Sequence, residues 1–202
     1  MIKWARQRGL TLIELMVVVA VLGALTMLVA PSFRDMILMQ RLRGINAQVT
    51  TDMQFARSEA VSRGRIARVM LGSDPNQTCY VIYTAVDGGQ RCDCTRGAGL
   101  ACQAHPNGTE IRTVSVLRSS GVTLAWPNSL APAPSSYYYF GFSHITGGLV
   151  SIPTDDNVAP VLLVEIDARI DDDRRLRNRI QQTGRPTVCA PNPARMQVTA
   201  CQ

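Results

Sequence analysis

The stretch QRGLTLIELMVVVAVLGALTMLVAPSF, residues 7–33, decides how the rest of the chain is organised. It opens with a basic lead-in and a glycine, and continues as an apolar run that is interrupted by Glu14 alone; from Leu15 to Phe33 there is no charge. A helix over residues 10–33, rising about 1.5 Å per residue, reaches roughly across a hydrocarbon core of about 30 Å. The run therefore predicts a membrane-spanning helix over 10–33.

Glu14 is the residue of this run that needs an explanation. An ionised side chain within a spanning helix costs about 2.5–3.5 kcal/mol or more, so it calls for a partner or a function. One interpretation places Glu14 at the shallow cytoplasmic interface of an ordinary signal anchor. The other is that the chain is cut between Gly9 and Leu10. The new α-amino group of a neighbouring copy then comes close to the carboxylate, and opposite charges attract strongly in a low dielectric.

The segment GLTLIE, residues 9–14, follows three basic residues and resembles the class III signal of type IV pilins and type II secretion pseudopilins. This resemblance implies that prepilin peptidase cuts after Gly9 and that Leu10 is then N-methylated. It also implies that Glu14 registers an incoming subunit during assembly. The chain departs from the family at Leu10, where most members have Phe.

The charge pattern predicts an orientation. Lys3, Arg6 and Arg8 precede the apolar run, and no acidic residue occurs among the first thirteen, so the N-terminus is expected in the cytoplasm and the bulk of the chain outside it. The chain has 202 residues, which allows one globular domain beyond the anchor. Of its 21 basic residues, three lie in the predicted leader over 1–9, which leaves 18 against 15 acidic residues. All 18 are Arg, a residue that suits bidentate binding of phosphates or carboxylates.

After Pro31 the apolar pattern becomes one-sided and predicts an amphipathic helix over 34–64. One helix is expected to run from the membrane to about Arg63, bent at Pro31 and closed by Gly64. Gly23 and Pro31 also fall where many pilins carry a glycine and a helix-kinking proline. The segment QFARSEAV, residues 54–61, resembles the end of this helix in minor pilins of the FimT/GspH type. The apolar positions, which recur every three or four residues and should face a sheet, are Leu38, Leu42, Ile45, Val49, Met53, Ala56 and Ala60.

From residue 66 onward, short segments rich in β-branched and aromatic residues predict strands. No helical segment separates them, so we expect an antiparallel arrangement. The predicted fold class is α+β: a long N-terminal helix packed on an antiparallel sheet or a two-sheet head over 65–202. The segment FGF and the later glycine pair, residues 140–148, resemble a strand and turn of the FimT/GspH fold. The predicted strands are 66–71, 79–85, 110–117, 122–126, 137–142, 149–152, 161–167 and 187–189.

Six cysteines in an exported domain of this size indicate disulfides rather than metal ligands. We expect Cys189 to pair with Cys201 across a short proline-containing loop. Two further bridges are expected within one loop region, whose pairing the spacing leaves open. The four cysteines of that region are Cys79, Cys92, Cys94 and Cys102.

No constellation of catalytic residues stands out. His105 and His144 are the only histidines, and neither belongs to a metalloprotease helix or a nucleophile motif. The run Asp171-Asp172-Asp173 lacks the turn glycine and the later Glu of a calcium loop, so we interpret it as solvated or paired with nearby arginines. The sequence therefore predicts no enzyme activity, metal or cofactor.

Aromatic residues fill the segment YYYFGF, residues 137–142. Such a segment can stack nucleic-acid bases. In a strand, however, alternate side chains point to opposite faces, so half of these rings must face the core. This geometry favours core packing over a base-stacking platform.

Seven arginines are concentrated in the last 34 residues of the chain. Clusters of this kind attract phosphate backbones. The segment TGRPTVC, residues 183–189, resembles the C-terminal Gly-Arg-x-Arg segment of FimT-type minor pilins, some of which bind DNA, but Thr187 stands where the second Arg belongs. The alternative is a solvated face neutralised by Asp171–Asp173 and by neighbouring pilins. The candidate DNA-binding residues are Arg174, Arg175, Arg177, Arg179 and Arg185.

These features together predict a structural subunit. The expected function is that of a minor pilin in a type IV pilus; the alternatives are a DNA-binding minor pilin of the FimT type and a GspH-type minor pseudopilin of a type II secretion system. The expected partners are other major and minor pilins, prepilin peptidase, the inner-membrane assembly platform and, in the second case, DNA. The expected location is the bacterial inner membrane, with the head in the periplasm, and afterwards the filament.

Overall fold

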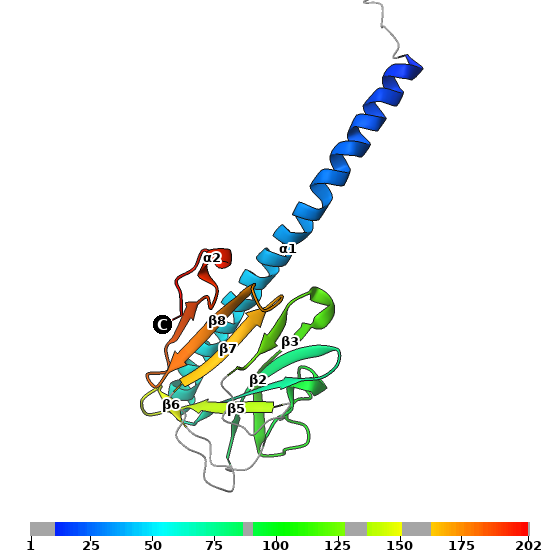
Figure 1. The fold of residues 1–202 in the computed structure, drawn as a ribbon. Helices are drawn as coiled ribbons and strands as arrows, with labels where there is room; N and C mark the ends of the chain where they lie inside the picture. The colour runs from blue at the N-terminus through cyan, green and yellow to red at the C-terminus, as the bar shows by residue number, and fades with distance from the viewer. Residues whose placement is uncertain (1–10, 87–90, 128–136, 151–162, 202) are drawn as a thin grey trace, which may run out of the picture. The chain divides into compact units, whose positions relative to one another are not determined.

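The computed structural model describes residues 11–86, 91–127, 137–150 and 163–201, and the side chains of 28–32 and 137 also lie outside this description (Figure 1). The chain divides into two compact units, Met1–Met39 and Gln40–Gln202. Helix α1, Leu12–Arg63, contributes to both units.

The first unit consists, in its described part, of the N-terminal portion of α1. Thr11 precedes the helix, and its Oγ1 accepts a hydrogen bond of 3.4 Å from the backbone N–H of Glu14, which satisfies one of the free donors of the first turn. The described large apolar side chains of residues 12–27 and 33–37 are exposed; Leu12, for example, is 74% exposed and Met36 57%. Among the residues that the structure describes, none of the helices combines the length and the hydropathy that a membrane crossing requires. The side chain of Pro31 is not described, so the bend there stays a prediction.

The second unit contains the amphipathic part of α1, and most of its predicted stripe is buried. Ile45 is half-buried; Leu38, also half-buried, is the one stripe residue that belongs to the first unit. The helix ends at Arg63 and is closed by Gly64, whose φ of 61° lies in the left-handed region that glycine tolerates best. The end of α1 is therefore where the sequence predicts it. The stripe residues that are at most 1% exposed are Leu42, Val49, Met53, Ala56 and Ala60.

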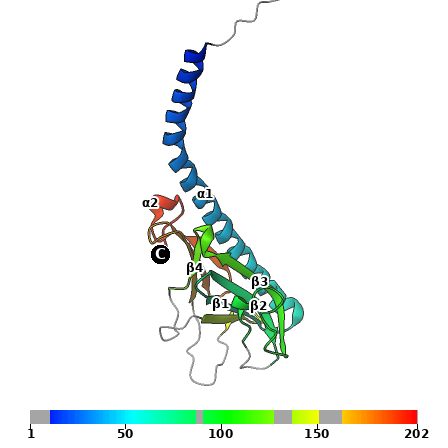
Figure 2. The same cartoon turned by 90° about the vertical axis from the view of Figure 1, so that its right-hand side faces the viewer.

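Two antiparallel sheets make up the rest of the second unit. The five-stranded sheet has the order β3-β2-β1-β5-β6 and the four-stranded sheet the order β4-β7-β8-β9. Figure 2 shows the strands of the larger sheet against the lower part of α1. The α+β prediction, a long helix packed on a two-sheet head, is confirmed. The strands are β1 Ala67–Ser73, β2 Gln77–Ala85, β3 Gly108–Leu117, β4 Thr123–Ala125, β5 Tyr137–Phe142, β6 Leu149–Val150, β7 Leu163–Arg169, β8 Arg175–Gln181 and β9 Pro186–Cys189.

Strand β8 corrects the sequence-based prediction, which left this segment outside the strands. Its sequence, RLRNRIQ, alternates in the manner of a strand: Leu176, Asn178 and Ile180 are buried, and the arginines between them are half-buried. It lies in the middle of the smaller sheet, paired with β7 on one side and β9 on the other (Figure 1). The arginine-rich segment is therefore part of the fold of the head.

The outer face of the larger sheet is covered by the loop between β2 and β3. Two disulfides close this loop, Cys79–Cys94 and Cys92–Cys102, and their cysteines pack with Val81 of β2 into a second apolar cluster. Glu110 of β3 holds the loop from the other side, because its carboxylate accepts backbone hydrogen bonds from Gly99 at 2.8 Å and Ala101 at 3.1 Å. The loop thus gives β1 and β2 two buried faces.

Candidate functional site

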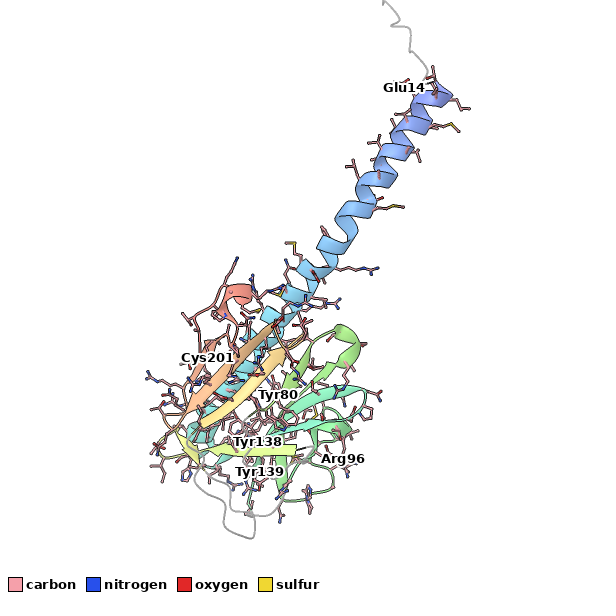
Figure 3. All side chains as sticks on the ribbon, in the orientation of Figure 1. Glu14, Tyr80, Arg96, Tyr138, Tyr139 and Cys201 are labelled. Atoms are coloured by element: carbon pink, nitrogen blue, oxygen red, sulfur yellow. A yellow bond between two sulfur atoms is a disulfide. The ribbon has the colours of Figure 1, made fainter. Side chains whose placement is uncertain are left out.

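The N-terminal processing motif is described only in part. Gly9 and Leu10, the predicted cleavage and methylation residues, lie outside the described residues. Glu14 lies in the first turn of α1 with an exposed side chain (Figure 3). Exposed apolar area costs about 25 cal/mol per Å² in water, and a run of exposed apolar side chains such as that of residues 12–27 marks an interaction with lipid or with another protein. We therefore expect the described apolar side chains of the first unit to contact lipid or another protein.

The second unit holds α1 through a buried carboxylate. Asp52 is 1% exposed and accepts a hydrogen bond of 2.6 Å from the hydroxyl of Tyr80 in β2. Arg112 of β3 donates to the other carboxylate oxygen and stacks over the ring of Phe55, 4.6 Å from its centroid. Burial raises the pKa of Tyr80, and the neighbouring Asp52 carboxylate raises it further. Asp52 is not among the apolar positions that predict the buried face of α1, so its burial could not be inferred from that pattern.

A second polar contact joins α1 to the smaller sheet. The side-chain amide of Asn178 in β8 donates to Asn46 Oδ1 at 2.7 Å, and its Oδ1 accepts a hydrogen bond of 2.6 Å from the hydroxyl of Thr50. Asn46 and Asn178 are 4% and 0% exposed. Each buried amide is thus paired, as buried polar groups require.

Three of the candidate DNA-binding arginines belong to an ion-pair ladder on the smaller sheet. Arg177 forms a bidentate pair with Asp167 of β7, at 2.7 and 2.9 Å, and reaches Glu165 at 3.0 Å. Arg179 lies 3.0 Å from Glu165, and Arg175 lies 3.8 Å from Asp167. Both carboxylates are at most 5% exposed. Their hydrogen bonds and charge raise the pKa of Arg177, so these arginines neutralise buried acids of the neighbouring strand.

Arg174 is engaged in the turn between β7 and β8. Asp171 accepts hydrogen bonds of 2.7 Å from the backbone N–H and from the Nε of Arg174, and one of 3.1 Å from the backbone of Asp173. The Arg174 side chain lowers the pKa of the Asp171 carboxyl. The aspartate run therefore builds a turn and pairs with the adjacent arginine.

Arg185 differs from the other four candidates. It follows Gly184 in the turn between β8 and β9, its side chain is exposed, and within the described part of the chain it forms no ion pair. Together with Gln54 and Arg57 of α1 and with Pro186, it lines a hollow of about 330 Å³. The structure thus brings Arg185 next to Arg57, which sequence reasoning did not include among the candidate residues.

The aromatic segment of β5 packs inside the head. Tyr138, Phe140 and Phe142 are at most 5% exposed, and successive ring centroids lie 6.1 and 5.7 Å apart. Tyr139 points to the other face, packs against the disulfide cluster and carries the Arg91 guanidinium 4.4 Å above its ring. Core packing therefore accounts for the described rings of this segment, as its alternation predicts (Figure 3).

The C-terminal end of the chain is closed by a disulfide. The Cys189–Cys201 bond is present, with a sequence separation of 12 residues, and joins the end of β9 to the segment after α2, Pro193–Met196. Met196, fully buried, anchors this loop. All six cysteines are disulfide-bonded.

Comparison with protein families gave two matches. Residues 4–30 match the prokaryotic N-terminal methylation motif, and residues 47–135 match the type II transport protein GspH. Neither the curated proteins nor the solved structures contain a significant match to the chain. The arginine ladder and the Arg185 turn lie beyond the GspH-matching region. The two matches are consistent with a GspH/FimT-like pilin, and so is the long N-terminal helix packed on a two-sheet antiparallel head.

Proposed function

We propose that the chain is a minor pilin, a low-abundance structural subunit of a type IV pilus. The observation that carries this proposal is the methylation motif over residues 4–30, which includes the exposed apolar side chains at the start of α1. Pilins and pseudopilins act as structural subunits together with other pilins and an assembly machinery. Such a motif goes with membrane anchoring before assembly.

In this proposal, prepilin peptidase removes residues 1–9 and Leu10 becomes the methylated N-terminus. The helix over 10–33 anchors the subunit in the inner membrane, with the N-terminus in the cytoplasm and the head in the periplasm. On assembly the same apolar surface packs against the helices of neighbouring subunits. Glu14 then neutralises the N-terminal amine of an adjacent subunit, because two opposite charges in a low dielectric stabilise each other.

Filament incorporation of Glu14 variants tests this role. We expect Glu14→Gln to be cleaved and to accumulate in the membrane, but to be lost from sheared filaments. Glu59→Gln is the matched control, since Glu59 lies in the same helix within the second unit and pairs with Arg63. Equal amounts of Glu14→Gln and unchanged protein in the filament fraction would contradict the role of Glu14.

A second candidate is a minor pseudopilin of a type II secretion system, supported by the match to the type II transport protein GspH over residues 47–135. Deleting the gene distinguishes the two. Loss of secreted enzymes with intact pili supports the pseudopilin, and loss of pili with intact secretion supports the pilin.

A third candidate, DNA binding through the arginine-rich segment, has narrower support. Four of its five arginines pair with Glu165, Asp167 or Asp171. Of these five arginines, Arg185 has an exposed guanidinium that forms no ion pair with the described residues. If the full chain in detergent retards a DNA duplex and Arg185→Ala abolishes this, the DNA hypothesis gains. No retardation at low salt contradicts it, because phosphate-backbone binding is strongest there.

A further inference from the structure

The hollow at one end of the head combines two guanidinium groups from distant parts of the chain. Gln54 and Arg57 come from α1, and Arg185 and Pro186 from the turn that leads into β9. None of the four lining residues is acidic. The walls therefore offer guanidinium and amide donors beside one apolar proline ring.

Close packing of glycines holds this hollow in shape. A Cβ on Gly184 would lie 2.1 Å from the carbonyl oxygen of Gly147, and a Cβ on Gly148 would lie 2.6 Å from that of Gln182. Both distances are too short for real atoms, so the β5–β6 and β8–β9 turns touch only because these residues are glycines. The φ of Gly184, 74°, independently favours glycine. The packing of the two turns thus fixes where Arg185 leaves the backbone.

Arg57 is held in place by the same turn. Its Nε donates a hydrogen bond of 3.0 Å to the carbonyl oxygen of Gly147, and a Cβ on Gly147 would lie 2.7 Å from that Nε. This hydrogen bond uses one edge of the guanidinium and leaves its two Nη groups for another acceptor. The side chain is half-buried, so its orientation is set before any ligand arrives.

The charge of these two arginines is not balanced within the described residues. Neither Arg57 nor Arg185 forms an ion pair there, whereas Arg174, Arg177 and Arg179 all do. A guanidinium fork forms two parallel hydrogen bonds with a carboxylate or with a phosphate. A DNA duplex presents a row of phosphates with one charge per ~1.7 Å of axis, so the affinity for it increases with the number of free cations arranged in a row. Two guanidiniums beside an apolar wall match one isolated carboxylate better.

We propose that this hollow is a subunit contact, in which Arg57 and Arg185 bind a carboxylate side chain on the head of a neighbouring pilin. The inference rests on the proposed function and adds to it the chemistry of one partner surface. Gln54 donates to the same carboxylate, and Pro186 excludes water from one side. The contact acts between heads, independently of the pairing that Glu14 makes at the start of the helix.

The test uses the full chain in detergent with its arginines labelled with ¹⁵N. The probe is acetyl-Glu-Glu-Glu-amide, with acetyl-Gln-Gln-Gln-amide, inorganic phosphate and a short DNA duplex as comparisons. We expect the Glu peptide to shift the Nε–H resonances of Arg57 and Arg185, and the Gln peptide to leave them unchanged. Arg185→Ala and Arg57→Lys should each weaken binding about tenfold, since each removes part of the bidentate recognition. Arg195→Ala, at an exposed position outside the hollow, should not change it.

Three results would overturn the proposal. Tighter binding of the duplex, lost in the same two variants, would make the hollow a DNA site. Equal affinity for phosphate and the Glu peptide would make it a general anion site, and the absence of any shift would leave it without a ligand role. None of these results affects leader removal after Gly9, so failure here is distinguishable from failure of the pilin function.

Discussion

Asp52 shows how one residue ties the helix to the head. A buried carboxylate without partners is strongly unfavourable, and Tyr80 and Arg112 supply the partners from two strands of the larger sheet. The apolar stripe of α1 gives the helix its affinity for the sheets, but apolar contacts have no direction. The hydrogen bonds of Asp52 therefore specify how α1 is rotated and placed along the sheet within the second unit.

Replacing Tyr80 by Phe tests this contact. The change keeps the ring and removes the donor to Asp52, so we expect the free energy of unfolding to fall by about 1–3 kcal/mol. Tyr138→Phe is the matched control: its hydroxyl is buried and has no hydrogen-bond partner among the described residues. Removing that hydroxyl should leave stability unchanged or raise it, as measured by urea unfolding. Equal losses in the two variants would contradict the role given to Asp52.

Tyr138 also predicts how the stability of the protein depends on pH in the alkaline range. Burial raises the pKa of Tyr138 to about 12, whereas a tyrosine in the unfolded chain titrates near 10. Between these two pH values the folded chain keeps a proton that the unfolded chain releases. The contribution of Tyr138 to the free energy of unfolding is therefore fully present below pH 10 and is lost as the pH rises through about 12. We expect Tyr138→Phe to flatten this fall. Parallel curves for the variant and the unchanged protein would exclude a contribution from Tyr138.

At the scale of elements, β8 determines whether the arginine-rich segment is a ligand surface or part of the fold. Antiparallel pairing sets Arg177 opposite Asp167 and Arg179 opposite Glu165. Opposite charges across a strand pair stabilise a sheet, and they matter more when both carboxylates are buried. The ladder is therefore an internal feature of the smaller sheet.

Arg177→Ala tests the ladder. It removes the bidentate partner of Asp167 and leaves a buried carboxylate short of donors, so we expect a loss of about 3 kcal/mol in the free energy of unfolding. Arg195→Ala, which removes the same charge from an exposed position, should stay within about 0.5 kcal/mol of the unchanged protein. A stable Arg177→Ala protein that has lost only affinity for DNA would contradict this account and support the DNA hypothesis.

The disulfide-closed loop carries a further prediction at this scale. The Cys79–Cys94 bond has a sequence separation of 15 residues, and the loop that it closes covers the outer face of β2. Replacing both cysteines by Ser should lower the free energy of unfolding by about 3 kcal/mol, through the loop-closure entropy of the unfolded chain. Thermal unfolding of the double variant measures this. An unchanged midpoint would show that the loop covers the sheet without contributing to its stability.

The elements that could be predicted from the sequence are those whose signal is local. β5 has the predicted bounds because its aromatic run is continuous. α1 ends at Arg63 because Gly64, which follows it, readily adopts the left-handed conformation that closes a helix. β8 was missed because alternating arginines resemble a solvated charge run, and their partners lie in another strand. The hollow beside Arg57 could not be predicted either, since it depends on the contact between two turns far apart in the chain.

At the scale of the whole molecule, the two family matches fall on regions with different physical requirements. The methylation motif covers residues 4–30, before and within the exposed apolar part of α1, and the GspH match covers residues 47–135, in the second unit. The head buries most of its described apolar residues within itself, whereas most of those described in the first unit are exposed. This asymmetry is what a subunit requires if its helix is to be covered by lipid first and by sister helices afterwards.

The N-terminus of the mature protein tests this claim most directly. We expect mass spectrometry of the protein, extracted from membranes of cells with an active prepilin peptidase, to find a chain that begins at N-methylated Leu10. Recovery of the protein with residues 1–9 still attached would contradict assembly as a pilin. It would leave α1 without the free amine that Glu14 is proposed to meet.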